Sequence, residues 1–251
     1  KNYYRSHPFS KQRLEQVKKY KLQYQKVSFD EQKISLNNNI ISLQYIKNKI
    51  KAYSFDPNNL MKNLENKNDF LSNYSQMIAL YRLGKYDSAH KKLSLIKNKY
   101  EEYPFFSELE GDIHFKKGNF NIAINEYEKA IQTLQEVFSP STDLIKFSLI
   151  KTYLQTNNSA NLNKSIILLE ELLLNNPNWS YLWRLLSKAS GKLNKKGMAY
   201  IALAEEALIK KNFIKAKKYV DLANKQSSLP ISYKLRGSDI LNKIKLKYKN
   251  K

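Results

Sequence analysis

The sequence predicts an all-α protein, an α-solenoid of antiparallel helix pairs, and three observations support this fold class. The chain of 251 residues is 42% hydrophobic and 12% aromatic, which is enough apolar material for a packed core. It contains only six glycines and six prolines, too few for the frequent turns of a β-sandwich. A short pattern also recurs at a fixed interval, as it does in proteins built from stacked repeats.

The recurring pattern is a glycine, an aromatic residue two positions later and an alanine five positions after the glycine. It occurs in Leu83–Ala89 and again in Lys117–Ala123, so that 34 residues separate Gly84 from Gly118. Glycine permits a sharp turn between two helices, and a small alanine lets those helices approach closely. A period of 34 is that of the tetratricopeptide repeat (TPR), and we therefore predict a TPR-type array.

The repeat frame divides the chain into predicted parts. An N-terminal helical layer covers residues 14–70, with helices expected at Lys11–Gln25 and Leu36–Tyr53. The repeat region 71–230 follows, and residues 231–251 form a C-terminal capping helix, which such arrays need to cover their last apolar face. The predicted repeat units lie at about 71–102, 103–136, 142–176 and 179–226.

The later units depart from the pattern. In the third unit we expect a loose polar loop at Thr156–Asn163, with Ser165 in the position of the helix-B alanine. In the last unit we pair Ala199–Lys210 with Asn212–Gln226, and Ser232–Lys247 is the expected capping helix.

In a TPR array the first helix of each pair, helix A, lines a concave groove that can hold a peptide. Aromatic rings supply contact area there, and charged groups set the direction of the peptide. Glu108 and Asp112 are expected to be groove charges and not an acid/base pair, because nothing nearby in the sequence would separate their pKa values. The frame assigns these residues to the groove: Tyr74, Ile78, Tyr81, Phe105, Glu108, Asp112, Phe115, Tyr181, Arg184 and Lys188.

The chain lacks the residue sets that common catalytic sites require. It has no cysteine, no HExxH sequence and no glycine-rich phosphate loop. Of its three histidines, we expect His90 on an outward part of helix B and His114 at a packed position of helix A. The sequence therefore predicts no catalytic residue, metal ligand or cofactor in this chain.

The formal net charge of +22 raises the question of nucleic-acid binding. The basic residues are mostly lysines scattered through every segment, and scattered charge attracts an anion without fixing its register. A solvated surface is the favoured interpretation. Two alternative functions remain open. One is a free-standing TPR adaptor or co-chaperone, and the other, less favoured, is a basic α-solenoid that binds nucleic acid.

Several segments together carry a resemblance to a known family. The stretch Tyr4–Arg13 resembles the end of the catalytic domain of bacterial HtpX-like zinc metalloproteases, in which a His-Pro is followed by an Arg. Tyr103–Gly111 is similar to the opening of the second TPR in the branch that assists outer-membrane β-barrel assembly. Trp183–Leu186, Ala202–Glu205 and Leu235–Leu241 are similar to its later repeats and terminal helix, most like the alphaproteobacterial members.

This resemblance implies that residues 1–13 are the tail of a protease domain whose HExxH helix would lie upstream of Lys1. The implied parent is a periplasmic zinc-dependent metalloendopeptidase, with zinc as its cofactor and His7 close to the metal. The repeats would then recruit client proteins or the outer-membrane assembly machinery. We expect protein or peptide partners, no specific nucleic acid and no transmembrane segment.

Overall fold

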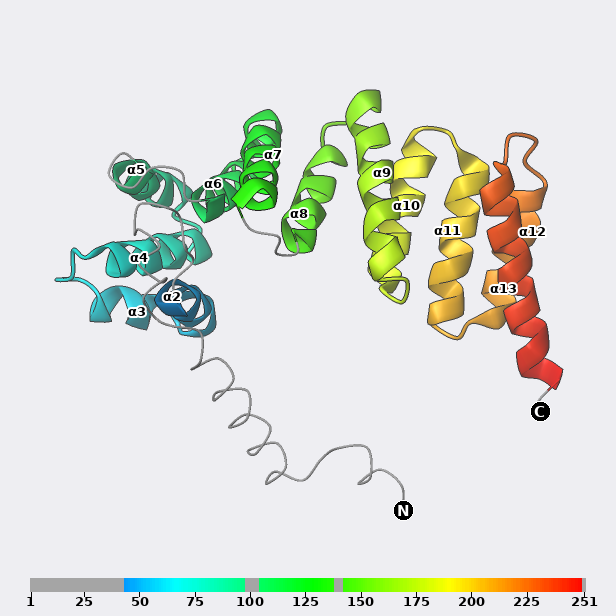
Figure 1. Cartoon of the computed structure of the whole chain (residues 1–251), viewed down its shortest axis with the longest axis horizontal. Helices are drawn as coiled ribbons and strands as arrows, with labels where there is room; N and C mark the ends of the chain where they lie inside the picture. Colours follow the sequence, from blue (N-terminus) through cyan, green and yellow to red (C-terminus); the bar gives the residue numbers. More distant parts are fainter. Residues whose placement is uncertain (1–42, 98–103, 138–141, 250–251) are drawn as a thin grey trace, which may run out of the picture. The chain divides into compact units, whose positions relative to one another are not determined.

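The computed structural model describes residues 43–97, 104–137 and 142–249, and every regular element within these ranges is an α-helix (Figure 1). The described residues from Lys47 onward belong to one compact unit. None of the described helices is long and apolar enough to cross a lipid bilayer. The helices are α2 Leu43–Ser54, α3 Pro57–Asn63, α4 Phe70–Arg82, α5 Tyr86–Lys97, α6 Pro104–Lys116, α7 Phe120–Val137, α8 Asp143–Tyr153, α9 Ser159–Asn175, α10 Ser180–Lys192, α11 Lys196–Ile209, α12 Phe213–Asn224 and α13 Ile231–Lys249.

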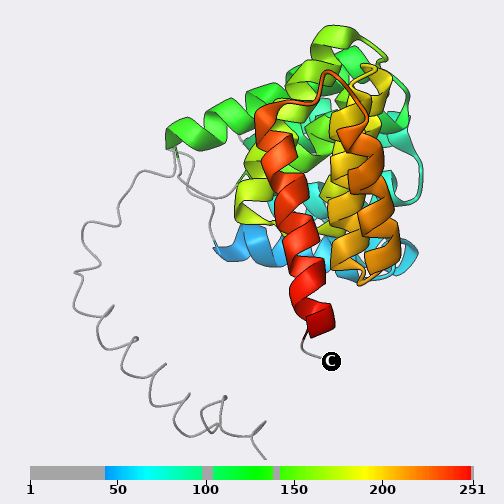
Figure 2. The same cartoon turned by 90° about the vertical axis from the view of Figure 1, so that its right-hand side faces the viewer.

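From α3 onward, these helices pack mainly against the helices next to them in the chain. The pairs α4–α5, α6–α7, α8–α9, α10–α11 and α12–α13 are in contact, and so are the helices that join one pair to the next. In addition α13 lies beside both α11 and α12 (Figure 2). Contacts restricted to near neighbours are what a linear repeat array requires. The predicted all-α array of helix pairs is therefore confirmed.

Four corners between consecutive helices share one hydrogen-bonded geometry. At each of them a residue adopts left-handed backbone angles: Gly84 with φ 73°, Gly118 with φ 79°, Asn194 with φ 57° and Lys211 with φ 59°. At each corner the next N–H reaches back to the carbonyl five residues earlier, which closes a Schellman motif. These bonds are Lys85 N to Leu80 O, Asn119 N to His114 O, Lys195 N to Ser190 O and Asn212 N to Ala207 O.

The corner between α8 and α9 corrects the predicted loop at Thr156–Asn163. Helix α9 already begins at Ser159, because the side chain of Asn158 accepts hydrogen bonds from the N–H groups of residues 160 and 161. The left-handed residue is Asn157, with φ 52°. Counting five residues from this corner places Leu162, not Ser165, at the position of the helix-B alanine.

The predicted last unit, residues 179–226, contains three helices and not one pair. Its two corners, Asn194 and Lys211, lie 17 residues apart, which is half of the repeat length. Helix α11 therefore packs against α12, as predicted, and equally against α10. One face of α12 is buried through Ala216, Val220 and Ala223.

The described part of the N-terminal segment packs on the first repeat. Asp56 caps α3, and α3 packs against α4. The Arg82 guanidinium donates to the carbonyl of Ala52 at 2.7 Å and to that of Phe55. The predicted helix Lys11–Gln25 and the resemblance at residues 1–13 lie outside the described residues.

Replacing Lys211 by glycine should raise the free energy of unfolding by about 0.5–1 kcal/mol. A left-handed lysine is strained by roughly 1–2 kcal/mol, and glycine relieves this at a smaller entropic cost. Thermal or urea unfolding measures the change. The control is Lys225→Gly, at a helix end with right-handed angles, which should not stabilise the protein. Equal effects at the two lysines would contradict the corner geometry.

Candidate functional site

Two of the residues predicted to line a groove are core residues. The side chain of Tyr74 is 2% exposed and that of Ile78 is 0% exposed. The Tyr74 ring packs 6.1 Å from the ring of Phe106 on α6. Because both side chains are enclosed, neither can contact a bound peptide, and their assignment to the groove is wrong.

Four predicted residues lie along one side of α6. Phe105, Glu108, Asp112 and Phe115 follow one another at spacings of three or four residues, which places them on one helical face, and all four are half-buried. The ammonium of Lys49, on α2, lies 2.5 Å from a carboxylate oxygen of Glu108 and 4.4 Å from the centre of the Phe105 ring. One cation thus contacts both an acidic and an aromatic member of this face.

Asp112 has an unusual environment for a carboxylate. Burial raises its pKa to about 6, and the neighbouring negative charge of Glu108 adds to this increase. The Tyr127 hydroxyl donates to Asp112 at 2.6 Å, and this bond and the positive charges of Lys151 and Lys49 act in the opposite direction. The expectation that nothing nearby would perturb one carboxylate against the other is therefore wrong.

Tyr81, also predicted for the groove, lies near the same carboxylate at the end of α4. Its pKa is raised, first by burial and then by the charge of Asp112. Its ring lies 5.9 Å from that of Tyr86, the aromatic residue that follows the Gly84 corner. Tyr81 is only partly exposed, and its ring packs against α5.

Helix α8 adds two residues that the sequence analysis missed. The ammonium of Lys151 lies 4.8 Å from the centre of the Phe147 ring and 6.0 Å from that of Phe115 on α6. Burial lowers the pKa of Lys151, because a partly desolvated ammonium holds its proton less tightly. Both residues lie on helix A of the third repeat, at the same distances from the Asn157 corner as Glu108 and Asp112 from Gly118.

Three predicted groove residues lie on α10, and they differ in how they relate to the residues of α6 and α8. Tyr181 is 48% exposed, and its ring lies 6.0 Å from that of Phe147. Arg184 is exposed but already donates two hydrogen bonds of 2.6 Å to Glu206 on α11. Lys188 is exposed. Tyr181 is therefore the α10 residue that the contacts join to the rest.

These contacts link side chains of α2, α6, α8 and α10 into one surface, which we call the helix-A strip. It combines four aromatic rings with two carboxylates and two lysines, and every member except Tyr181 is half-buried. The helix-A strip consists of Lys49, Phe105, Glu108, Asp112, Phe115, Phe147, Lys151 and Tyr181.

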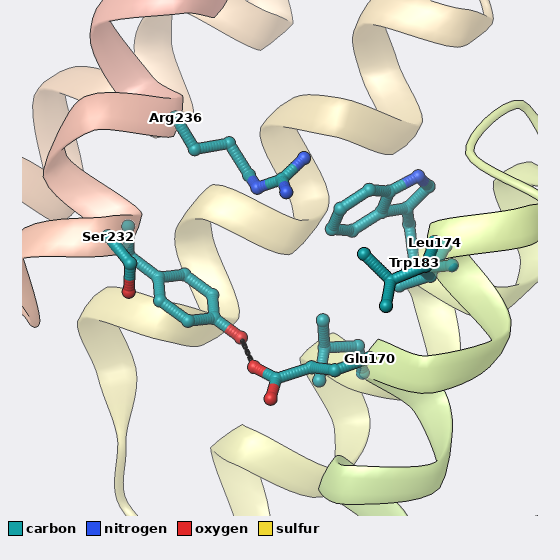
Figure 3. A pocket seen from close by; sticks show the side chains of 8 residues that line it. Glu170, Leu174, Trp183, Ser232 and Arg236 are labelled. Atoms are coloured by element: carbon teal, nitrogen blue, oxygen red, sulfur yellow. Dashed lines mark hydrogen bonds between the residues drawn. The ribbon is translucent and has the colours of Figure 1, made fainter.

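A separate pocket of about 260 Å³ lies between α9, α10 and α13 (Figure 3). The Arg236 guanidinium lies 4.9 Å from the centre of the Trp183 ring, and it also pairs with Glu205 at 3.0 Å. On the other side of the pocket the Tyr233 hydroxyl donates to Glu170. The polar groups around the pocket therefore already bind one another, and their contacts hold α13 against the repeats.

Comparison with known proteins identifies little. No family model matches the sequence, and no curated protein matches it. A solved structure of a tetratricopeptide repeat protein from Parabacteroides merdae is similar over 79% of this chain and 99% of its own length, with 13% identity and a TM-score of 0.37. The repeat fold of this chain therefore rests on its own corners and packing.

Proposed function

We propose that this chain is a protein-interaction module that binds an extended or helical peptide segment along the helix-A strip. One observation carries the proposal: aromatic rings and charges of both signs, drawn from four helices, adjoin one another on a single surface and are held partly out of water. Ligand-binding surfaces use rings for contact area and a few fixed charges for orientation.

The charges of the helix-A strip indicate what the peptide carries. At neutral pH Asp112 is ionised although burial opposes its charge. A peptide lysine or arginine placed against Asp112 would supply an opposite charge at that point. The rings of Phe115 and Phe147 would hold an adjacent apolar side chain. The preferred peptide therefore has a basic residue beside an aliphatic or aromatic one.

We further propose that the module belongs to a periplasmic zinc metalloprotease and recruits client or outer-membrane-assembly proteins for it. This part rests on the resemblance of Tyr4–Arg13 and Tyr103–Gly111 to HtpX-like proteases. Tethering a client beside a catalytic site would raise its effective concentration there. An HExxH segment encoded in the same reading frame upstream of Lys1 would support this parentage, and a frame without one would contradict it.

The binding proposal is tested with a random-peptide display library selected against the purified chain. Selected peptides should combine basic and apolar residues. Fluorescence anisotropy then gives the Kd of one labelled peptide for variants of the chain. Phe115→Ala and Phe147→Ala should each weaken binding by at least about tenfold, or ~1.4 kcal/mol, since truncating a binding hot spot costs more than about 1 kcal/mol.

The matched controls remove exposed apolar side chains elsewhere on the repeats. Leu95→Ala on α5 and Ile122→Ala on α7, at positions 68% and 46% exposed, should leave the Kd unchanged. Thermal melting checks that every variant is folded. Peptide binding that is lost only in the two control variants would refute the proposal that the peptide binds along the helix-A strip. Sequence-specific binding of RNA or DNA without any peptide binding would favour the basic nucleic-acid solenoid instead.

A further inference from the structure

Away from the helix-A strip, three potential metal ligands converge where α5 meets α6. His90 projects from α5, and Glu110 and His114 project from successive turns of α6. One nitrogen or oxygen ligand atom of each residue lies within 4.8 Å of those of the other two. His90 Nε2 is 3.4 Å from a carboxylate oxygen of Glu110, and the two imidazole rings meet edge to face with centres 5.1 Å apart.

The two histidines were expected to play separate structural roles, and the fold instead brings them together. His114 is packed as predicted, with 7% of its surface exposed. His90 is only partly exposed and faces Glu110 and His114. In the sequence 24 positions separate the two residues, and only the packing of α5 on α6 joins them.

The donor atoms of this cluster suit a metal ion. A neutral imidazole keeps a lone pair for a ligand bond. The side-chain amide of Asn119 lies 3.4 Å from His114 Nδ1 and helps to orient the ring. Two imidazoles and one carboxylate form a ligand set that zinc accepts.

A second carboxylate lies close to this cluster. A side-chain oxygen of Glu126, on α7, is buried and makes no hydrogen bond. It lies 3.8 Å from the ammonium of Lys97, which also pairs with Glu110. Lys97 thus neutralises two carboxylates beside the imidazoles. Its side chain is partly exposed, so the ammonium can move into water when another cation takes its place.

We propose that His90, Glu110 and His114 bind one divalent transition-metal ion of the zinc type, with Glu126 or a water molecule completing the coordination. The ion joins α5 to α6, and therefore the first described repeat to the second. Because α6 also carries half of the residues of the helix-A strip, the metal stiffens the surface on which the peptide binds. Its role is structural, and it is distinct from any zinc that a protease parent would use for catalysis.

The site is tested on the untagged chain, stripped with a chelator and titrated with Zn²⁺ in competition with a chromogenic chelator. We expect saturable binding of one ion per chain. Co²⁺ in its place should give the visible absorption of a low-symmetry site. Binding only to the folded state should also raise the melting temperature as Zn²⁺ is added. His90→Gln, His114→Gln and Glu110→Gln should each weaken binding by more than about 100-fold, beyond the ~10–100-fold typical of outer-shell partners.

Matched controls separate this site from adventitious binding. His7→Gln removes the remaining histidine, and Glu108→Gln removes a carboxylate from the other side of α6; both should bind Zn²⁺ like the wild type. Lys97→Gln should bind about fivefold more tightly, because it removes a competing cation. Circular dichroism in chelator checks folding, and the partly exposed His90 keeps the test decisive if His114→Gln does not fold.

The proposal is overturned if the wild type shows no saturable Zn²⁺ binding, or if binding survives the loss of His90 and Glu110. Zinc binding that disappears only with His7→Gln would also overturn it. Peptide binding is measured separately with Phe115→Ala. A negative result for the metal site therefore does not refute peptide binding at the helix-A strip, and a negative result for peptide binding does not refute the metal site.

Discussion

Replacing Gly111 by alanine should lower the free energy of unfolding by about 1–3 kcal/mol, whereas the same change at Gly191 should raise it by up to about 1 kcal/mol. Alanine is the better helix former at both positions. A Cβ atom at Gly111, however, would lie 2.7 Å from the ring of Tyr127, and that ring is buried. Overpacking of this kind costs about 1–3 kcal/mol. At Gly191 a Cβ atom would meet nothing within 4 Å.

Urea unfolding of the two variants measures the difference directly. The clash at Gly111 also pushes Tyr127 away from Asp112, so the hydrogen bond between them should lengthen or break. The tyrosine ultraviolet spectrum or an NMR titration of Asp112 reports this second effect. A stabilised Gly111→Ala variant would mean that α6 and α7 do not cross as closely as the repeat geometry requires.

Replacing Asp112 by asparagine should stabilise the protein at pH 7, by up to about 3 kcal/mol. Its pKa rises from 3.8 to about 6 on folding, and each unit is worth about 1.4 kcal/mol. A carboxyl with a raised pKa binds its proton more tightly in the folded state. The bound proton of Asp112 therefore adds its full share to the free energy of unfolding below about pH 4. This share is lost as the pH rises to about 6. The asparagine carbonyl can still accept the Tyr127 hydrogen bond.

The difference in stability between Asp112→Asn and the wild type should thus be large at pH 7 and close to zero at pH 4. Asp69 provides a control of opposite sign, because hydrogen bonds from Ser72 lower its pKa. Its contribution is present at neutral pH and decreases as the pH falls. A lower stability of Asp112→Asn than of the wild type at pH 7 would contradict this prediction. It would mean that the ionised carboxylate stabilises the fold, and that Asp112 is not a charge buried at a cost for ligand binding.

How much of the fold and of the candidate site could be predicted from the sequence depends on how each feature is encoded. The corners at Gly84 and Gly118 were predictable because glycine is the residue that adopts left-handed angles most easily. At Asn157 the same backbone conformation carries no glycine, so the loop of the third repeat was predicted too long. With that corner in place, the repeat frame would have pointed to Phe147 and Lys151.

Other features depend on contacts between distant segments, which a repeat frame does not contain. Tyr74 and Ile78 occupy the same frame positions as Glu108 and Asp112, yet the packing of α4 encloses them. The pKa of Asp112 depends on burial and on Tyr127, from a different helix. The cluster of His90, Glu110 and His114 forms only when α5 packs on α6. A single sequence shows which residues are available, and the three-dimensional contacts decide their roles.

The most direct test of the account is to locate a bound peptide by photo-crosslinking. A photoreactive phenylalanine analogue is placed at Phe115 or Phe147 on the helix-A strip, and at Leu95 or Ile122 as controls, with a display-selected peptide as the partner. We predict crosslinks from the first two positions, each competed away by unlabelled peptide, and none from the controls. Crosslinks confined to Leu95 or Ile122 would show that the repeats bind their partner through another surface.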